Sequence, residues 1–115
     1  MEKLVIHGGK PLQGTVRVSG AKNAVLPIIV ASMLGTTQST LTEIPKLADV
    51  HTVCDVIASL GVHIEHPERD TLVIDAHELT STTAPYDLVR RMRASFLVMG
   101  PLLARKGRAQ ISLPG

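Results

Sequence analysis

The sequence contains no tryptophan, one phenylalanine, one tyrosine and one cysteine in 115 residues. A single cysteine, Cys54, excludes an internal disulfide and suits a reducing compartment, so we expect a cytoplasmic protein. Two aromatic residues cannot build a row of stacking surfaces, so a platform for single-stranded nucleic acid is not expected. Twelve Lys and Arg against ten Asp and Glu give a formal net charge of only +2, a weak basic bias that does not by itself predict a nucleic-acid partner.

Long hydrophobic runs are also missing. The two longest, near 24–34 and 96–104, are too short to span a bilayer and contain Pro27 and Pro101. The N-terminal apolar stretch ends at Gly8-Gly9, so neither a secretory signal nor a membrane partner is expected. Hydrophobic residues make up 44% and charged residues 19%, which is typical of one modest globular domain with its own core.

Hydrophobic periodicity predicts an α/β domain. Three apolar helix patterns each end in glycine: those near 21–34, 47–60 and 86–105 stop at Gly35, Gly61 and Gly107. A strand pattern follows each helix. These strands are predicted at 40–44, at 62–65 with 71–75, and at 108–113. The third helix is expected to bend near Gly100-Pro101. This βαβαββ-like order favours a layered α/β domain.

The first twenty residues stand apart from this pattern. Short strand patterns at 4–6 and 15–18 flank a glycine-rich turn before the first helix. We therefore expect residues 1–20 to belong to another layer or domain. At the other end, the turn signal at 112–115 indicates a piece of a longer chain.

Lys22 and Asn23 raise an electrostatic question, because they stand where the first predicted helix begins, in SGAKNAVLPI. A cation at a helix N-terminus costs about 0.3–1 kcal/mol. One interpretation makes Asn23 the helix cap and Lys22 its solvated neighbour. The other makes both residues, with the helix N–H groups, a site for phosphate or carboxylate. Spacing alone favours the first interpretation, and no Walker or dinucleotide-binding glycine pattern is present.

Arg93 lies on the shoulder of an apolar helical face in the segment 88–96. We expect its guanidinium to be partly buried beside a fixed anionic or polar partner, and Arg90 and Arg91 to be solvated. The five histidines show no metal spacing, so no metal site is expected. Cys54 lies on the apolar stripe of the second helix and is expected to be a core thiol.

Six motifs follow one another along the chain: SGAKNA at 19–24, PKLADV at 45–50, APYDLV at 84–89, MRAS at 92–95, GPLLAR at 100–105 and SLPG at 112–115. Together they resemble the N-terminal part of the enolpyruvyl transferases that act on UDP-N-acetylglucosamine. The resemblance covers the whole chain. It implies βαβαββ units of an inside-out α/β barrel, incomplete here, with two domains that close over the substrates. Residues 1–20 then supply strands to the second domain, and 21–115 form the N-terminal part of the first.

The resemblance also implies a reaction. The enolpyruvyl group passes from phosphoenolpyruvate to the 3-hydroxyl of UDP-N-acetylglucosamine, phosphate is released, and neither a metal nor another cofactor is needed. Residue by residue, it places Lys22 and Asn23 on phosphoenolpyruvate and Arg93 on the sugar nucleotide. The family's catalytic cysteine lies beyond Gly115, and Cys54 matches no motif cysteine. We therefore expect this chain to be inactive without the remainder of the polypeptide.

Two alternatives remain open. A shikimate-pathway enolpyruvyl transferase shares the donor, but its lysine usually follows Asp and precedes Ser-Ile-Ser-His-Arg, where this chain has Ala21 and Asn23-Ala-Val25. The other alternative is a non-catalytic α/β module that binds RNA or phosphate through a basic face. That face would comprise Lys22, Arg90, Arg91, Arg93 and Arg108.

Overall fold

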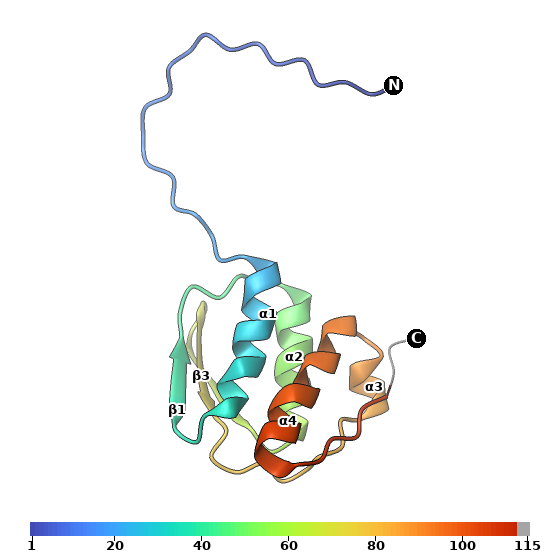
Figure 1. The fold of residues 1–115 in the computed structure, drawn as a ribbon. Helices are drawn as coiled ribbons and strands as arrows, with labels where there is room; N and C mark the ends of the chain where they lie inside the picture. The colour runs from blue at the N-terminus through green and yellow to red at the C-terminus, as the bar shows by residue number, and fades with distance from the viewer. Residues whose placement is uncertain (113–115) are drawn as a thin grey trace.

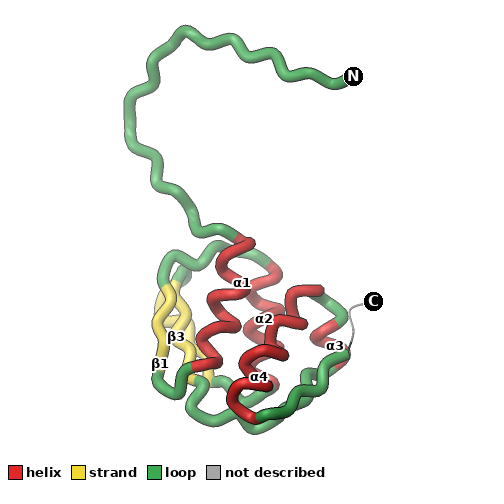
Figure 2. Tube along the Cα trace, in the orientation of Figure 1, coloured by secondary structure: helices red, strands yellow, loops and turns green. Residues whose placement is uncertain are grey.

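A computed structural model describes residues 1–112 of the chain. Its elements are α1 (Lys22–Ala31), the 3₁₀ helix η1 (Ser32–Leu34), β1 (Gln38–Leu41), α2 (Ala48–Ser59), β2 (His63–Glu68), β3 (Thr71–Asp75), α3 (Tyr86–Val89), the 3₁₀ helix η2 (Arg93–Val98) and α4 (Met99–Lys106). The sheet forms one layer and the helices pack beside it (Figures 1 and 2). The predicted α/β class is therefore confirmed.

The sheet has the strand order β1-β3-β2, and β3 is antiparallel to both neighbours. Consequently β1 and β2 run parallel to each other, and α2 connects them. Between Glu65 and Glu68 the β2 strand advances three residues while β3 advances two, from Val73 to Thr71, so β2 contains a β-bulge. The predicted hairpin of residues 62–65 and 71–75 is confirmed.

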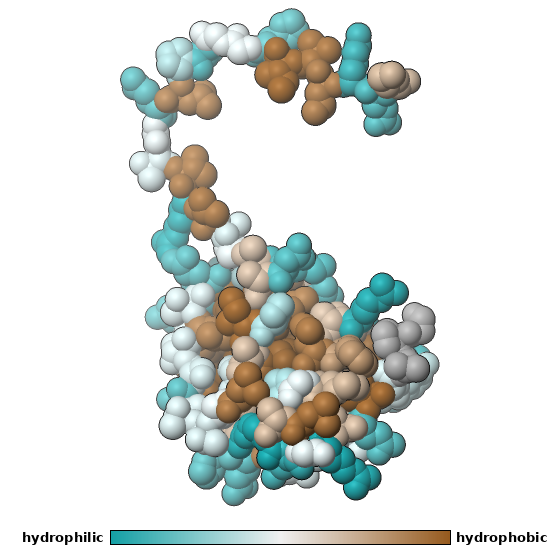
Figure 3. Space-filling view, viewed as in Figure 1, coloured by the Kyte–Doolittle hydropathy of each residue, from teal (hydrophilic) through white to brown (hydrophobic). Residues whose placement is uncertain are grey.

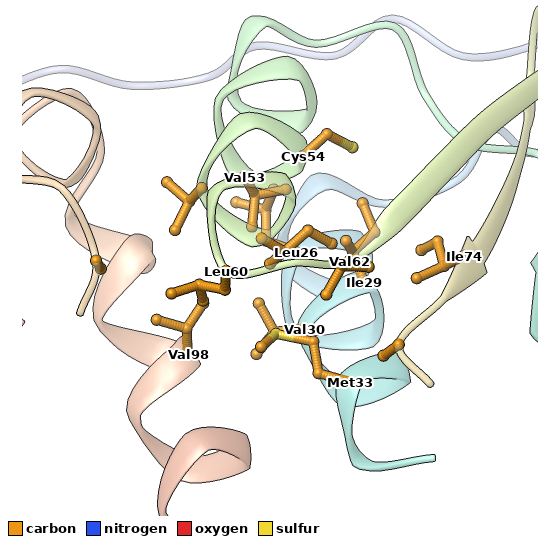
Figure 4. Close-up of a cluster of buried hydrophobic side chains, with 14 of the residues drawn as sticks. Leu26, Ile29, Val30, Met33, Val53, Cys54, Leu60, Val62, Ile74 and Val98 are labelled. Atoms are coloured by element: carbon orange, nitrogen blue, oxygen red, sulfur yellow. The ribbon is translucent and has the colours of Figure 1, made fainter. Parts of the chain in front are cut away.

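The core lies between the sheet and the helices. Helices α1 and α2 carry apolar residues at helical spacing, and these side chains converge with those of β3 and η2 (Figure 4). The largest side chains that are almost wholly removed from solvent are Ile29, Met33, Ile57, Leu60, Leu72, Ile74 and Leu102. Burial of this kind is the main stabilising contribution to such a small domain.

The prediction of one continuous helix over 86–105 is wrong. This segment is divided into α3, η2 and α4, and the break falls at Met92, whose backbone is extended (φ −154°, ψ 123°). Val89, before this break, and Met92, at the break, are both buried. Pro101 stands in the first turn of α4, where its missing N–H removes no helical hydrogen bond, so it does not interrupt that helix.

Two glycines end their helices for a steric reason. Gly61 has φ +106°, and a Cβ added there would lie 2.6 Å from the Thr80 hydroxyl oxygen. Gly107 adopts the left-handed conformation, with φ +70° and ψ 8°, just after α4. Gly35 has φ −90°, so the backbone at the end of η1 does not require glycine. The predicted stops are nevertheless in the right places.

The strands predicted at 4–6 and 15–18 are not formed. Residues 1–18 run as an extended segment away from the domain (Figure 1), and their apolar side chains are exposed (Figure 3). A two-stranded hairpin without a covering layer is marginal in water, which explains the difference. The assignment of residues 1–20 to a second domain remains a prediction. Of the strand predicted at 108–113, the described part forms one parallel bridge, between Gln110 and Thr83.

Candidate anion-binding site at the helix N-termini

The start of α1 carries Lys22 and Asn23. The helix cap is Ala21, and no side chain caps the first turn, so the interpretation of Asn23 as the cap is wrong. The N–H groups of Ala24 and Val25 both donate to the Ala21 carbonyl. Those of Lys22 and Asn23 have no acceptor within the described part of the chain. These two donors and the exposed Asn23 amide are therefore available to a ligand.

Lys22 forms an ion pair with Asp49, which lies in the first turn of α2. The Lys22 Nζ is 2.8 Å from the Asp49 Oδ2, and the two side chains are 54% and 31% exposed. This pair compensates for the lysine at the positive end of α1. It also links the start of α1 to the start of α2. Apart from its place in the motif PKLADV, no local pattern indicates the role of Asp49, because its partner Lys22 is 27 positions away.

Three helical segments begin at the same end of the domain. The starts of α1, of α2 and of the continuous η2–α4 segment all lie near the point where residues 1–18 leave (Figure 1). Helix N-termini carry partial positive charge and free N–H donors. This end of the domain is therefore electrostatically suited to an anion.

Arg93 is the first residue of η2, and its side chain is exposed. It makes no hydrogen bond or ion pair with any other residue of 1–112, so the expected partly buried guanidinium with a fixed partner is wrong. The cause is the extended backbone at Met92, which ends the apolar helical face on which Arg93 was placed. Lys22 and Asn23 are adjacent, whereas within residues 1–112 no hydrogen bond or ion pair joins Arg93 to either of them. Arg90 and Arg91 are exposed, as expected.

An open groove of about 390 Å³ adjoins the start of α1, and Gly20, Ala21 and Ala24 form part of its lining. A Cβ added to Gly20 would lie 2.5 Å from the Glu43 carbonyl oxygen, so no larger residue fits there without movement. Glu43 itself has φ 58° and pairs with Arg17. These contacts fix the chain just before the helix.

Arg105 has a structural role that the sequence patterns did not predict. From the last turn of α4 its guanidinium donates to the carbonyls of Met33 and His77, each at 3.1 Å, and to that of Ala76. In the sequence Arg105 stands close to Lys106 and Arg108, a basic cluster that would suit a compact anion. A signal existed, since arginine in a last helical turn often binds carbonyl oxygens, but nothing local indicated which ones.

Cys54 is a buried free thiol, as expected. Burial raises its pKa from 9.0 to about 11, and the neighbouring Asp55 adds to this. The raised pKa makes the thiol a poor nucleophile at neutral pH.

This pKa predicts a loss of stability in alkali. Above pH 9 the unfolded chain releases the thiol proton while the folded chain keeps it, so the free energy of unfolding falls as pH rises. The contribution of the protonated Cys54 thiol to the free energy of unfolding is fully present below pH 9. We expect a loss of roughly 2 kcal/mol by about pH 10.5. Urea unfolding at pH 8 and near pH 10.5 measures it. The Cys54→Ala variant is the control; an equal loss in that variant would assign the effect to other groups.

Among residues 1–112, no three His, Cys, Asp or Glu side chains are grouped so that they could hold a metal ion. Within the same part of the chain, no helix has both the length and the apolar composition needed to cross a bilayer.

Comparisons with known proteins extend over nearly the whole chain. A UDP-N-acetylglucosamine 1-carboxyvinyltransferase of Rickettsia felis is 52% identical over 118 residues, covering 100% of this chain and 28% of the relative. One from Carboxydothermus hydrogenoformans is 53% identical, covering 100% and 27%. This chain thus spans little more than a quarter of their length.

The fold is also similar to a solved structure. The enolpyruvyl transferase NikO from Streptomyces tendae superposes with a TM-score of 0.71 at 27% identity, over 89% of this chain and 24% of that one. The sequence profile of EPSP synthase (3-phosphoshikimate 1-carboxyvinyltransferase) matches residues 6–115. The resemblance noted from the six motifs is thereby confirmed, and the chain belongs to the EPSP synthase (3-phosphoshikimate 1-carboxyvinyltransferase) family.

Proposed function

We propose that the full-length protein containing this chain transfers the enolpyruvyl group of phosphoenolpyruvate to the 3-hydroxyl of UDP-N-acetylglucosamine and releases phosphate. The observation that carries this proposal is the 52% identity, over all of this chain, to proteins named for that activity. Because the chain spans 28% of that relative, the substrates are proposed for the whole protein. Its setting would be the cytoplasm, and its product would enter peptidoglycan synthesis.

The start of α1 is chemically suited to phosphoenolpyruvate, which brings a phosphate and a carboxylate. Lys22 supplies one full positive charge, and the N–H groups of Lys22 and Asn23 add donors at the positive end of a helix. In the proposed reaction the sugar hydroxyl adds to C2 of phosphoenolpyruvate and gives up its proton, while C3 gains a proton. The resulting tetrahedral intermediate then expels phosphate and loses a proton from C3, which restores the double bond. Positive charge held in place before the reaction favours the departure of phosphate.

Asn23 and Arg93 have supporting roles in the proposal. The Asn23 side chain is exposed beside Lys22, where its amide can orient a substrate by hydrogen bonding. Arg93 is the first residue of η2, and its exposed guanidinium has no hydrogen-bond or ion-pair partner within residues 1–112. It would bind the sugar nucleotide, whose diphosphate suits its planar fork. The remainder of the chain would close over these groups, and residues 1–20 would pair with that second domain.

Activity with two acceptors tests the proposal and separates it from the shikimate alternative. The family profile carries the name of the shikimate 3-phosphate enzyme, whereas the relatives above 50% identity are named for UDP-N-acetylglucosamine. With phosphoenolpyruvate and each acceptor in turn, we expect the full-length protein to release phosphate with UDP-N-acetylglucosamine only. Turnover with shikimate 3-phosphate alone would reverse the assignment. Salt-sensitive RNA binding without turnover would favour the non-catalytic module.

A further inference from the structure

A small cavity lies where the loop after β1 meets the β2–β3 hairpin. Its volume is about 60 Å³, room for about two water molecules at roughly 30 Å³ each, or for one small oxyanion. Buried Val50 and Leu72 form part of its wall. Four exposed basic side chains surround it: Lys46, His51, His66 and Arg69.

These basic side chains are not neutralised by neighbouring carboxylates. No acidic residue lines the cavity, and none of the four basic residues forms an ion pair within residues 1–112. Three nearby carboxylates pair with other side chains: Glu43 with Arg17, Asp49 with Lys22, and Glu65 with His63. Asp70 accepts a hydrogen bond from the neutral Thr71 hydroxyl and keeps its charge, but it does not line the cavity. Glu68 adjoins Arg69 in sequence but does not line the cavity. Lys46 and Arg69 therefore place two positive charges in the lining of the cavity, while the charges of Glu68 and Asp70 lie outside that lining.

The backbone brings these side chains together from separate elements. The β-bulge between Glu65 and Glu68 contributes His66, and bulges commonly redirect a side chain beside a site. The Ile44 N–H donates to the Asp70 carbonyl at 2.8 Å, which holds the loop carrying Lys46 against the hairpin turn. His51 comes from the uncapped N-terminal part of α2, so the positive end of that helix adjoins the cavity.

We propose that this cavity binds a phosphate-class oxyanion, either inorganic phosphate or the phosphate group of a small monoester. The volume limits the enclosed ligand to one such group. The Arg69 guanidinium provides a fork for two oxygens, and Lys46 and the histidines provide further donors. The lining contains none of Lys22, Asn23 and Arg93, so this site is separate from the proposed enolpyruvyl site and does not depend on it.

Proton NMR of the histidine rings tests the proposal in the 115-residue chain. As inorganic phosphate is added at constant pH and ionic strength, the His51 and His66 signals should shift and saturate. His7 and His77, which do not line the cavity, should not shift. We expect Arg69→Gln to weaken binding at least tenfold. The matched control, Arg108→Gln, removes an exposed arginine outside the cavity and should leave the affinity unchanged.

A second titration with methyl phosphate separates the two ligand sources. Equal affinity assigns the site to a phosphate group carried on a larger molecule, and binding of inorganic phosphate alone assigns it to the free ion. The proposal is overturned if chloride produces the same shifts, if all five histidines respond alike, or if His51 shifts without His66. It is also overturned if Arg69→Gln and Arg108→Gln weaken binding equally. Arg69 is exposed, so its replacement leaves the core intact.

Discussion

Replacing Lys22 by alanine in the full-length protein is expected to weaken phosphoenolpyruvate binding by about tenfold to a hundredfold. The variant loses the one full positive charge at the start of α1, and a hydrogen bond to a charged group contributes about 1.5–3 kcal/mol. Equilibrium titration measures this loss. The fold should survive, because the Lys22 side chain is 54% exposed and its pair with Asp49 contributes little in water.

The matched control for Lys22 is Lys106→Ala, which removes an exposed lysine in the last turn of α4. This variant should bind phosphoenolpyruvate as the unmodified protein does. Affinity for UDP-N-acetylglucosamine should change less than affinity for phosphoenolpyruvate in the Lys22 variant. Unchanged phosphoenolpyruvate affinity would show that Lys22 serves only the pair with Asp49.

Replacing Arg105 by methionine is expected to lower the free energy of unfolding by about 2–3 kcal/mol. Methionine keeps most of the aliphatic length but none of the donors. The carbonyls of Met33, Ala76 and His77 then lose their charged partner, and α4 loses its link to η1 and to the end of β3. Urea unfolding measures the change.

Two further substitutions locate the source of that effect. Arg105→Lys retains the charge but lacks the planar fork that reaches several oxygens, so its stability should be intermediate. Arg108→Met removes an exposed arginine and should change stability by less than about 0.5 kcal/mol. A loss with Arg108→Met as large as that with Arg105→Met would mean that net charge, and not the three carbonyl contacts, determines stability.

Local signals were sufficient for the middle of the chain. The apolar spacing of α2, the glycine stop at Gly61 and the alternation of the β2–β3 hairpin each predict the element that forms. All three depend on residues close together in sequence. The segment 86–105 shows where such signals fail, because its apolar spacing suits one helix while Met92, with neither glycine nor proline beside it, adopts an extended conformation.

The candidate site was only partly visible in the sequence. Lys22 and Asn23 were identified by their position at a helix start and by the motif around them. The partner of Lys22 was not, because Asp49 lies 27 residues further along the chain and meets it only when α1 and α2 pack together. Arg93 was predicted to be partly buried but is exposed. The prediction relied on a helical wheel, which assumes an unbroken helix.

The strand order has a consequence for how the chain folds. Every strand of the sheet, together with the connecting helix α2, comes from residues 38–75, so the sheet can form with short loop closures. Contacts such as that between Arg105 and the Met33 carbonyl close a far longer loop, across 72 positions. Because loop closure costs more entropy as the loop lengthens, the sheet, α1 and α2 can form first, and the addition of α4 is then the slower step.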